Sequence, residues 1–227
     1  MRAFGGALSS ASEAMHKPVQ EGRSACRGNM CVLYDDGLFE FHSTPQRLCG
    51  LQQKRTDNAF IAVWGTPIPQ EGQDVFNEFE RACGGDYSRL KYLAGSWIAV
   101  VYSISTRQLR LINDCFGTRP VFYYREIHSR RFSFASDVSH LKDIGTLDSA
   151  VNPDVLASWI WYGYNIATTG ILADAKHMDA GSVLVVDSTG RSEQSPYVTQ
   201  QDATHVNSRE DLIDRFEAVI GWACHTR

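Results

Sequence analysis

Cys31 is the residue whose position could support covalent chemistry, because it directly follows a methionine, Met30. If translation began at Met30 and that methionine were removed, Cys31 would carry a thiol and a free α-amino group. One residue would then supply both a nucleophile and the base that activates it. The competing interpretation is a buried strand cysteine, since reduced cysteines are often buried.

The cysteines as a set show no spacing typical of a metal site. The chain has 227 residues and six cysteines, without a Cys-x-x-Cys pair. Scattered cysteines in a chain of this length, with no secretory segment, predict reduced thiols in a cytoplasmic protein rather than zinc ligands or a disulfide framework. The six are Cys26, Cys31, Cys49, Cys83, Cys115 and Cys224.

Composition and charge argue against two classes of partner. The formal net charge is −4, which gives no electrostatic reason to expect nucleic acid. No run of residues approaches the ~18 apolar residues that span a bilayer. We therefore expect neither nucleic acid nor a membrane as a partner.

Ordered structure is predicted from Met30 onward, and residues 1–29 are expected to form a disordered extension. Turn residues separate short apolar segments, which predicts antiparallel strands rather than a parallel sheet. Helices are predicted where apolar residues recur at spacings of three and four. The strands are Cys31–Tyr34, Leu38–Phe41, Ala59–Trp64, Trp97–Ser103, Gln108–Asn113, Val121–Arg125, Phe132–Ala135 and Ser182–Asp187; the helices are Asp74–Cys83, 137–141, Asn152–Tyr162 and 207–227.

Three motifs in a fixed order carry a family resemblance. They are Ala94-Gly95-Ser96-Trp97-Ile98, then Asp114-Cys115-Phe116-Gly117-Thr118-Arg119-Pro120 with Val121-Phe122-Tyr123, then Phe134-Ala135-Ser136-Asp137. Together they resemble the glutaminase domain of the asparagine synthetase family. The resemblance implies a four-layer αββα sandwich of two mainly antiparallel sheets, the fold of N-terminal-nucleophile hydrolases. Residues 30–206 would form this domain.

The resemblance also implies roles that can be checked residue by residue. Arg2 stands where the family has its cysteine nucleophile, and no Arg-Gly-Pro-Asp motif is present to hold the substrate carboxylate. The Asn-Gly pair that binds the oxyanion maps to Trp64-Gly65. The aspartate that holds the substrate ammonium maps to Asp74, which could equally cap a helix. Gly65 and Asp74 are thus vestigial substrate-binding candidates, and no catalytic residue is expected unless Cys31 is N-terminal.

Two further expectations concern packing. The Asp114–Pro120 turn is expected to be structural, with Arg119 in an ion pair. The aromatic residues of the segment after Asn152 are expected to pack against the sheets; they are Trp159, Trp161, Tyr162 and Tyr164.

The last helix, 207–227, resembles the one that opens the synthetase domain of the family. No Ser-Gly-Gly-x-Asp-Ser loop is present, so ATP and Mg²⁺ are expected only in a missing synthetase half. The apolar stripe Leu212, Phe216, Val219 and Ile220 would contact that half, and a homodimer is an alternative consequence of its exposure.

Three functions remain open. The first is a catalytically silent glutaminase-like scaffold for an asparagine-synthetase-type ligase, closest in character to β-lactam synthetases and lasso-peptide cyclases. The second is an active glutamine amidotransferase that uses Cys31. The third is a free-standing binding or regulatory protein.

Overall fold

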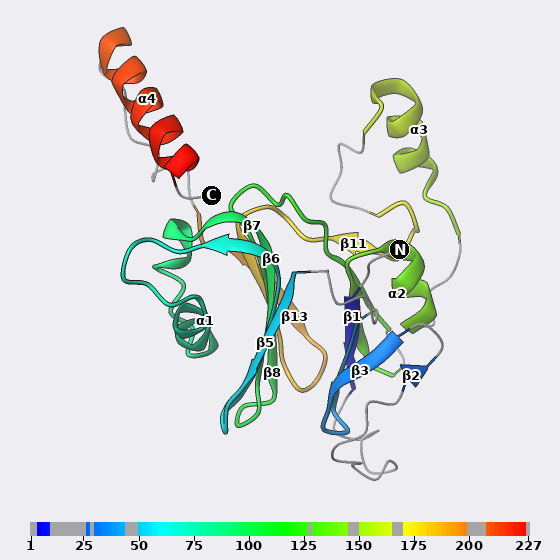
Figure 1. Ribbon diagram of the computed structural model, residues 1–227. Helices are drawn as coiled ribbons and strands as arrows, with labels where there is room; N and C mark the ends of the chain where they lie inside the picture. Colours follow the sequence, from blue (N-terminus) through cyan, green and yellow to red (C-terminus); the bar gives the residue numbers. More distant parts are fainter. Residues whose placement is uncertain are drawn as a thin grey trace. The chain divides into compact units, whose positions relative to one another are not determined.

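The computed structural model describes residues 4–9, 26–27, 30–43, 50–126, 129–144, 150–164, 170–198 and 208–225. It divides into two units, Met1–Tyr197 and Val198–Arg227. The first unit contains two β-sheets with helices on them (Figure 1). The second contains one helix.

The first sheet has seven strands in the order β11-β9-β10-β1-β4-β3-β2. Its paired strands are antiparallel, and β3 carries a bulge between Val32 and Tyr34. The strands are β1 (Phe4–Leu8), β2 (Cys26–Arg27), β3 (Met30–Asp35), β4 (Phe39–Ser43), β9 (Phe122–Arg125), β10 (Phe132–Ala135) and β11 (Lys176–His177).

The second sheet has six strands in the order β13-β12-β8-β7-β6-β5, and its paired strands are also antiparallel. The ten-residue strands β6 and β7 pair along their whole length at its centre, and their continuous apolar runs are buried. The strands are β5 (Leu51–Arg55), β6 (Ala59–Ile68), β7 (Ala94–Ser103), β8 (Gln108–Asn113), β12 (Ser182–Val186) and β13 (Ser192–Pro196).

The two sheets and the helices that pack on them form four layers. A cluster of buried side chains from both sheets fills the space between them, including Phe39, Phe41, Tyr102 and Phe134. The helix α1 (Val75–Cys83) packs on the outer face of β6 and β7, where Phe79 contacts Trp97. The helix α2 (Val138–Ile144) packs on β1 and β10. The predicted αββα arrangement of antiparallel sheets is therefore confirmed.

The four strands predicted from Trp97 to Ala135 form, and they are divided between the two sheets. β7 and β8 are a hairpin of the second sheet, and β9 and β10 are a hairpin of the first. The Asp114–Pro120 turn between them carries the chain from one sheet to the other. This turn thereby joins the two halves of the sandwich.

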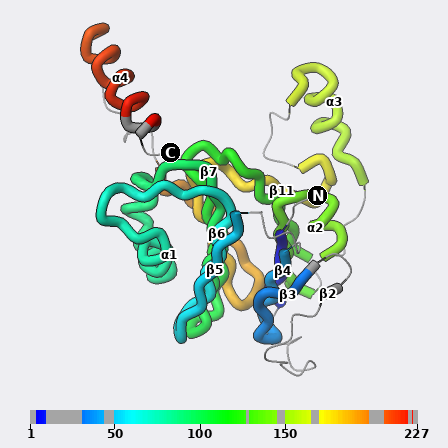
Figure 2. Tube along the Cα trace, viewed as in Figure 1, coloured from blue at the N-terminus to red at the C-terminus, as the bar shows by residue number. Residues whose placement is uncertain are grey.

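The first strand corrects the expectation of a disordered extension over residues 1–29. β1, the dark blue strand in Figures 1 and 2, lies between β10 and β4 inside the sheet. Phe4, Ala7 and Leu8 are buried. Gly5 and Gly6 allow its neighbours to approach, because a Cβ on Gly6 would lie 2.4 Å from the Glu40 carbonyl oxygen. Most of residues 10–29 lie outside the described residues, so their part of the prediction stays untested.

The remaining helices of the first unit are the 3₁₀ turn η2 (Leu90–Tyr92) and α3 (Pro153–Tyr162). α3 begins as predicted, because the Asn152 side chain accepts a hydrogen bond from the Asp154 N–H and Pro153 opens the helix. The expectation that its aromatic side chains pack on the sheets is wrong. Trp159, Trp161, Tyr162 and Tyr164 are all exposed.

The second unit contains α4 (Arg209–His225). The Ser208 hydroxyl caps it by accepting from the Asp211 N–H, in agreement with the predicted start. Five large apolar side chains among its described residues are exposed: Leu212, Ile213, Phe216, Val219 and Ile220. Among the described residues, no helix has the length and hydropathy needed to cross a bilayer.

Candidate functional site

The start of β1 meets Trp64 across the space between the sheets. Phe4 belongs to the first sheet and Trp64, on β6, to the second, and their ring centroids lie 5.1 Å apart in an edge-to-face arrangement. Phe4 also contacts Phe41, with ring centroids 5.9 Å apart. These rings fill the inter-sheet space beside the start of β1.

Arg119 also contacts the Trp64 ring. Its guanidinium carbon lies 4.5 Å from the Trp64 ring centroid, a cation–π arrangement. Its Nε donates to the Ser96 carbonyl oxygen over 3.2 Å. Among the described residues Arg119 has no ion-pair partner, so the expected ion pair is replaced by a stack on Trp64.

Gly65 is held in place by the strands around it. Its N–H donates to the Gly50 carbonyl oxygen over 3.1 Å, so this donor is engaged within the protein. Its φ is +118°, and a Cβ there would lie 2.2 Å from the Ser96 carbonyl oxygen. Glycine is therefore required by backbone geometry and by the close approach of β7.

The Asp114–Pro120 turn is organised by one buried carboxylate. The Asp114 side chain accepts from the N–H groups of Phe116 and Thr118 and from the Thr118 hydroxyl. It also accepts from the Trp97 N–H over 3.3 Å, which ties the turn to β7. Asp114 is 1% exposed, so its carboxylate serves the turn rather than a ligand.

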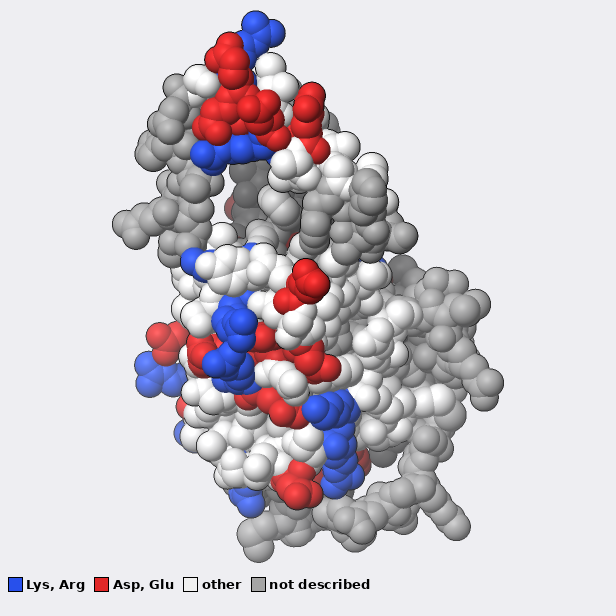
Figure 3. Space-filling view, turned by 60° about the vertical axis from the view of Figure 1, so that its left-hand side comes forward, with Lys and Arg blue, Asp and Glu red and all other residues white. Residues whose placement is uncertain are grey.

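Asp74 lies at the N-terminus of α1. Its carboxylate accepts from the Asn77 N–H over 2.9 Å, which makes it the helix cap. The surface around it carries two ion pairs, the half-exposed Lys54–Glu80 pair and Arg89–Glu78, whose carboxylate is buried. Figure 3 shows this face, where positive and negative side chains are interleaved rather than grouped by sign. No hydrogen bond or ion pair between described residues joins Asp74 to Trp64 or Gly65.

Cys31 lies within β3, which pairs with strands on both sides. Its backbone is in register with Ser43 of β4 and with Cys26 of β2. It is half-buried. A chain that began at Met30 would lack β1, which separates β4 from β10 in the sheet. A translation start at Met30, which would make Cys31 N-terminal, therefore removes a central strand of the first sheet.

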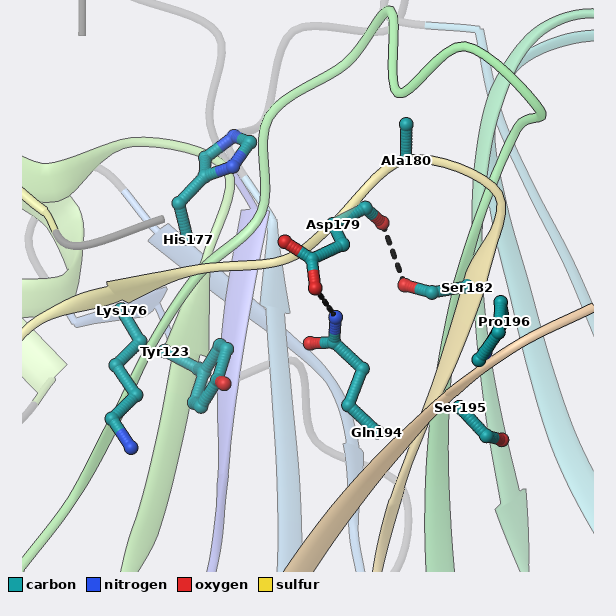
Figure 4. Close-up of a pocket in the computed structure, with 9 residues that line it drawn as sticks. All are labelled: Tyr123, Lys176, His177, Asp179, Ala180, Ser182, Gln194, Ser195 and Pro196. Carbon is teal, nitrogen blue, oxygen red and sulfur yellow. Dashed lines mark hydrogen bonds between the residues drawn. The ribbon is translucent and has the colours of Figure 1, made fainter. Parts of the chain in front are cut away.

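A second feature is a cleft at the open edge of the sandwich, which we call the edge cleft (Figure 4). It has a volume of about 400 Å³ and lies between β9 and β11 of the first sheet and β12 and β13 of the second. Its lining is Tyr123, Lys176, His177, Asp179, Ala180, Ser182, Gln194, Ser195 and Pro196.

Buried hydrogen bonds position the loop that crosses this cleft. The Asp179 carbonyl oxygen accepts from the Asn113 side-chain amide over 2.7 Å and from the Ser182 hydroxyl over 2.6 Å. Asn113 is 1% exposed, and its amide oxygen accepts from the Ser182 N–H. The Asp179 carboxylate accepts from the Gln194 amide over 2.5 Å, as drawn in Figure 4. The loop is thus fixed by Asn113 from within.

The electrostatics of the edge cleft favour a neutral histidine in a cleft that two opposite charges also line. Burial lowers the pKa of His177, and the Asp179 carboxylate opposes this only in part. Burial, with Asp179 nearby, raises the pKa of Tyr123. Lys176 and Asp179 line the cleft without an ion-pair partner among the described residues. Such a cleft can bind a small molecule that carries both charges.

No set of three or more His, Cys, Asp or Glu side chains among the described residues is arranged to hold a metal ion. The cysteines whose side chains are described lie apart, at Cys31, Cys83, Cys115 and Cys224.

A family model described as the glutamine amidotransferase domain matches residues 76–198, more than half of the chain. The chain belongs to this family. The matched part of this amidotransferase domain runs from α1 to the end of β13 and includes the inter-sheet turn and the edge cleft. A search of curated proteins gives no match.

Two solved structures are similar to the amidotransferase domain. One is glutamine phosphoribosylpyrophosphate amidotransferase from B. subtilis, complexed with ADP and GMP, with a TM-score of 0.44 and 10% identity. The alignment covers 87% of this chain and 43% of that one. The other is the allosteric regulatory enzyme of purine biosynthesis, with a TM-score of 0.41 and 8% identity over 88% and 44% of the two chains. This chain therefore spans less than half the length of either protein.

The structure brings together only some of the residues singled out in the sequence. Trp64-Gly65 lies beside the start of β1, whereas Asp74 caps a helix and Cys31 lies inside a paired strand. Arg119 and the edge cleft were missed as site features. A signal for the cleft was present, since polar residues flank the fully buried Met178 on both sides.

Proposed function

We propose that this amidotransferase domain does not hydrolyse glutamine and serves as a scaffold for an amide-forming ligase of the asparagine-synthetase type. The observation that carries the proposal is the stack of Arg119 on Trp64, which packs on Phe4 at the start of β1. The family resemblance puts an oxyanion-binding asparagine where Trp64 stands. An indole ring there occupies the space that a substrate amide would need.

The chemistry of glutamine hydrolysis supports the same conclusion. A nucleophile is needed immediately before β1, and Arg2 and Ala3 carry neither a thiol nor a hydroxyl. Donors for the oxyanion are needed as well, yet Trp64 lacks a side-chain amide and the Gly65 N–H donates to Gly50. Loss of one such donor typically lowers a rate about 10²–10³-fold.

The alternative, an active amidotransferase that starts at Cys31, has less support. It requires a chain without β1, whose Phe4 and Leu8 belong to the buried cluster between the two sheets. Intact-mass measurement of the natural protein tests this alternative. A mature amino terminus at Cys31 would favour it over the silent domain.

In the proposed ligase, ATP and Mg²⁺ would be bound by a synthetase half, either a synthetase-type domain or a separate ATP-binding subunit. The exposed apolar side chains of α4, such as Phe216 and Val219, would contact that half. β-Lactam synthetases and lasso-peptide cyclases offer the chemical precedent suggested by the resemblance, because they use an amine already in the substrate instead of ammonia. Nothing in the proposal requires a glutaminase.

Glutamine hydrolysis by the purified full chain tests the silent-domain proposal. We expect no ammonia above the level of a Cys31→Ala variant. Ammonia release that disappears in this variant would disprove the proposal. An adjacent reading frame that encodes a Ser-Gly-Gly-x-Asp-Ser protein, and co-elution of its product with this chain, would test the scaffold role.

A binding function is the second candidate, and the edge cleft favours it. Lys176 and Asp179 present opposite charges to one cleft, and Tyr123 is drawn between Lys176 and Gln194 in Figure 4. A zwitterion such as a short peptide could place its carboxylate at Lys176 and its ammonium at Asp179. Calorimetry with the dipeptide alanyl-alanine tests this candidate. Asp179→Asn should weaken binding, whereas Asp143→Asn, outside the cleft, should leave it unchanged.

A further inference from the structure

α3 presents a group of large apolar side chains to solvent. Trp161 is 81% exposed, Ile160 75% and Trp159 52%. The group, which we call the α3 surface, is completed by Leu156, Tyr162 and Tyr164, all exposed. Of the helix residues only Val155 is buried. A helix that is apolar around most of its circumference is usually covered on several sides.

The α3 surface is a well-formed structural element. Asn152 caps the helix start, and Gly163 ends it in the left-handed conformation with its N–H donating to the Trp159 carbonyl oxygen. The Ser158 hydroxyl donates to the Tyr164 carbonyl oxygen, and the rings of Tyr162 and Tyr164 lie 6.4 Å apart. The side chains are therefore displayed on a regular helix.

Backbone hydrogen bonds anchor the base of α3 to a second segment of the same unit. The Asn152 N–H donates to the Ile171 carbonyl oxygen, and the Ala173 N–H donates to the Ala150 carbonyl oxygen. Val151 and Leu172 form an isolated antiparallel bridge between these bonds. Ordering costs on binding are reduced when the docking element is preformed.

We propose that two copies of this chain associate through their α3 surfaces. The contact would be isologous, with the same residues on both sides, as in most homodimers. Such a surface must be complementary to itself, which a surface with almost no charged side chains allows. The helix and the two residues after it, 153–164, carry a single charged residue, Asp154. Tryptophan and tyrosine are also the residues most enriched at binding hot spots.

The available area agrees with a stable dimer. Aromatic side chains bury roughly 150–250 Å² each when fully covered. At exposures between 46% and 81%, the six side chains of the α3 surface offer roughly 100 Å² each, about 600 Å² per copy. A stable interface buries about 800 Å² per partner, so these side chains supply at most about three quarters of it and the rim of the contact adds the rest.

Two alternatives fit the structure less well: self-association through α4, and binding of the α3 surface to a membrane. α4 is a poorer surface for self-association, because the four acids and two arginines between 209 and 225 would place like charges together. Helices that lie on membranes usually carry Lys or Arg on their polar face, and residues 150–164 contain neither. A second copy is therefore the occupant that we infer, whether or not the domain supports a ligase.

Sedimentation velocity of the full chain over about two decades of concentration tests the dimer. We expect a concentration-dependent monomer–dimer equilibrium that weakens at least tenfold in Trp161→Glu. Phe116→Glu is the matched control, since Phe116 is 85% exposed but lies in the inter-sheet turn. Phe216→Glu places the same change on α4. Neither control should alter the dimer.

Crosslinking tests the α3 contact independently if Trp161→Glu does not fold. Ile160→Cys, in a Cys224→Ser background, should crosslink between copies with a short bifunctional maleimide, and Ser105→Cys should not. A monomer at all concentrations would overturn the inference. So would a dimer lost only in Phe216→Glu, or a monomer that binds phospholipid vesicles through Trp161.

Discussion

The space between the two sheets is filled by side chains beside β1 and is open at the edge cleft. Beside β1 it is filled by Phe4 and Trp64, with Arg119 stacked on the indole. At the edge formed by β11 and β13 it stays open, with Lys176 and Asp179 at the cleft. Aromatic side chains thus occupy the first site, and polar groups line the second.

The two sites differ in what their side chains can contribute. The Phe4–Trp64 pair adds about 0.5–1.5 kcal/mol beyond burial, and the stacked Arg119 adds about 1 kcal/mol. Asp179 and Lys176 contribute little to stability because both are exposed. The filled site is expected to matter for folding and the open site for binding.

Removal of residues 1–29 should have the largest effect. The shortened chain lacks β1, so β4 and β10 lose their common neighbour and the main core loses Phe4 and Leu8. We expect no cooperative thermal unfolding transition by circular dichroism. A folded, soluble protein starting at Met30 would contradict the assignment of β1 to the core.

Trp64→Ala should destabilise the domain by about 2–3 kcal/mol, less than for a fully buried tryptophan because Trp64 is half-buried. It removes the ring contacts to Phe4 and Arg119 together. Urea denaturation measures the change. Phe116→Ala, at an exposed aromatic residue, should change stability by less than about 0.5 kcal/mol. Equal effects for the two would refute the structural role of the filled site.

Asn113→Ala should cost about 2 kcal/mol, because it leaves the Ser182 N–H and the Asp179 carbonyl oxygen without this buried partner. It should also weaken the binding of any ligand to the edge cleft, since Asn113 fixes the Asp179 loop. Gln194→Ala removes an exposed partner of the same aspartate and should leave stability nearly unchanged. A larger loss for Gln194→Ala would reverse this assignment.

Acid should destabilise the domain through two histidines. Burial lowers the pKa of His140 and of His177 below the ordinary value of 6.5. The unfolded chain therefore binds protons that the folded chain does not, and stability falls as the pH drops below about 6.5. Thermal unfolding between neutral and mildly acidic pH measures the slope. His177→Gln should reduce the slope, and a steeper slope in this variant would contradict the burial argument.

Much of the fold followed from sequence patterns because those patterns report burial directly. The apolar runs of β6, β7 and β12 and the Asp74 cap of α1 are local signals, and each element forms near its predicted position. β1 escaped detection because Phe4–Leu8 contains two glycines and is a strand only through its two neighbours.

The sites were less predictable, since they depend on contacts between distant residues. The partner of the Gly65 N–H, Gly50, and the stack of Arg119 on Trp64 are both set by tertiary packing. The exposure of Trp161 could not be predicted from its residue type, because tryptophan is buried to a large extent in most proteins.

The most direct test of the central claim is intact-mass spectrometry of the full chain after incubation with an electrophilic glutamine analogue. The filled site and the absence of a thiol immediately before β1 predict an unchanged mass. A covalent adduct that is blocked by glutamine and lost in Cys31→Ala would contradict the account.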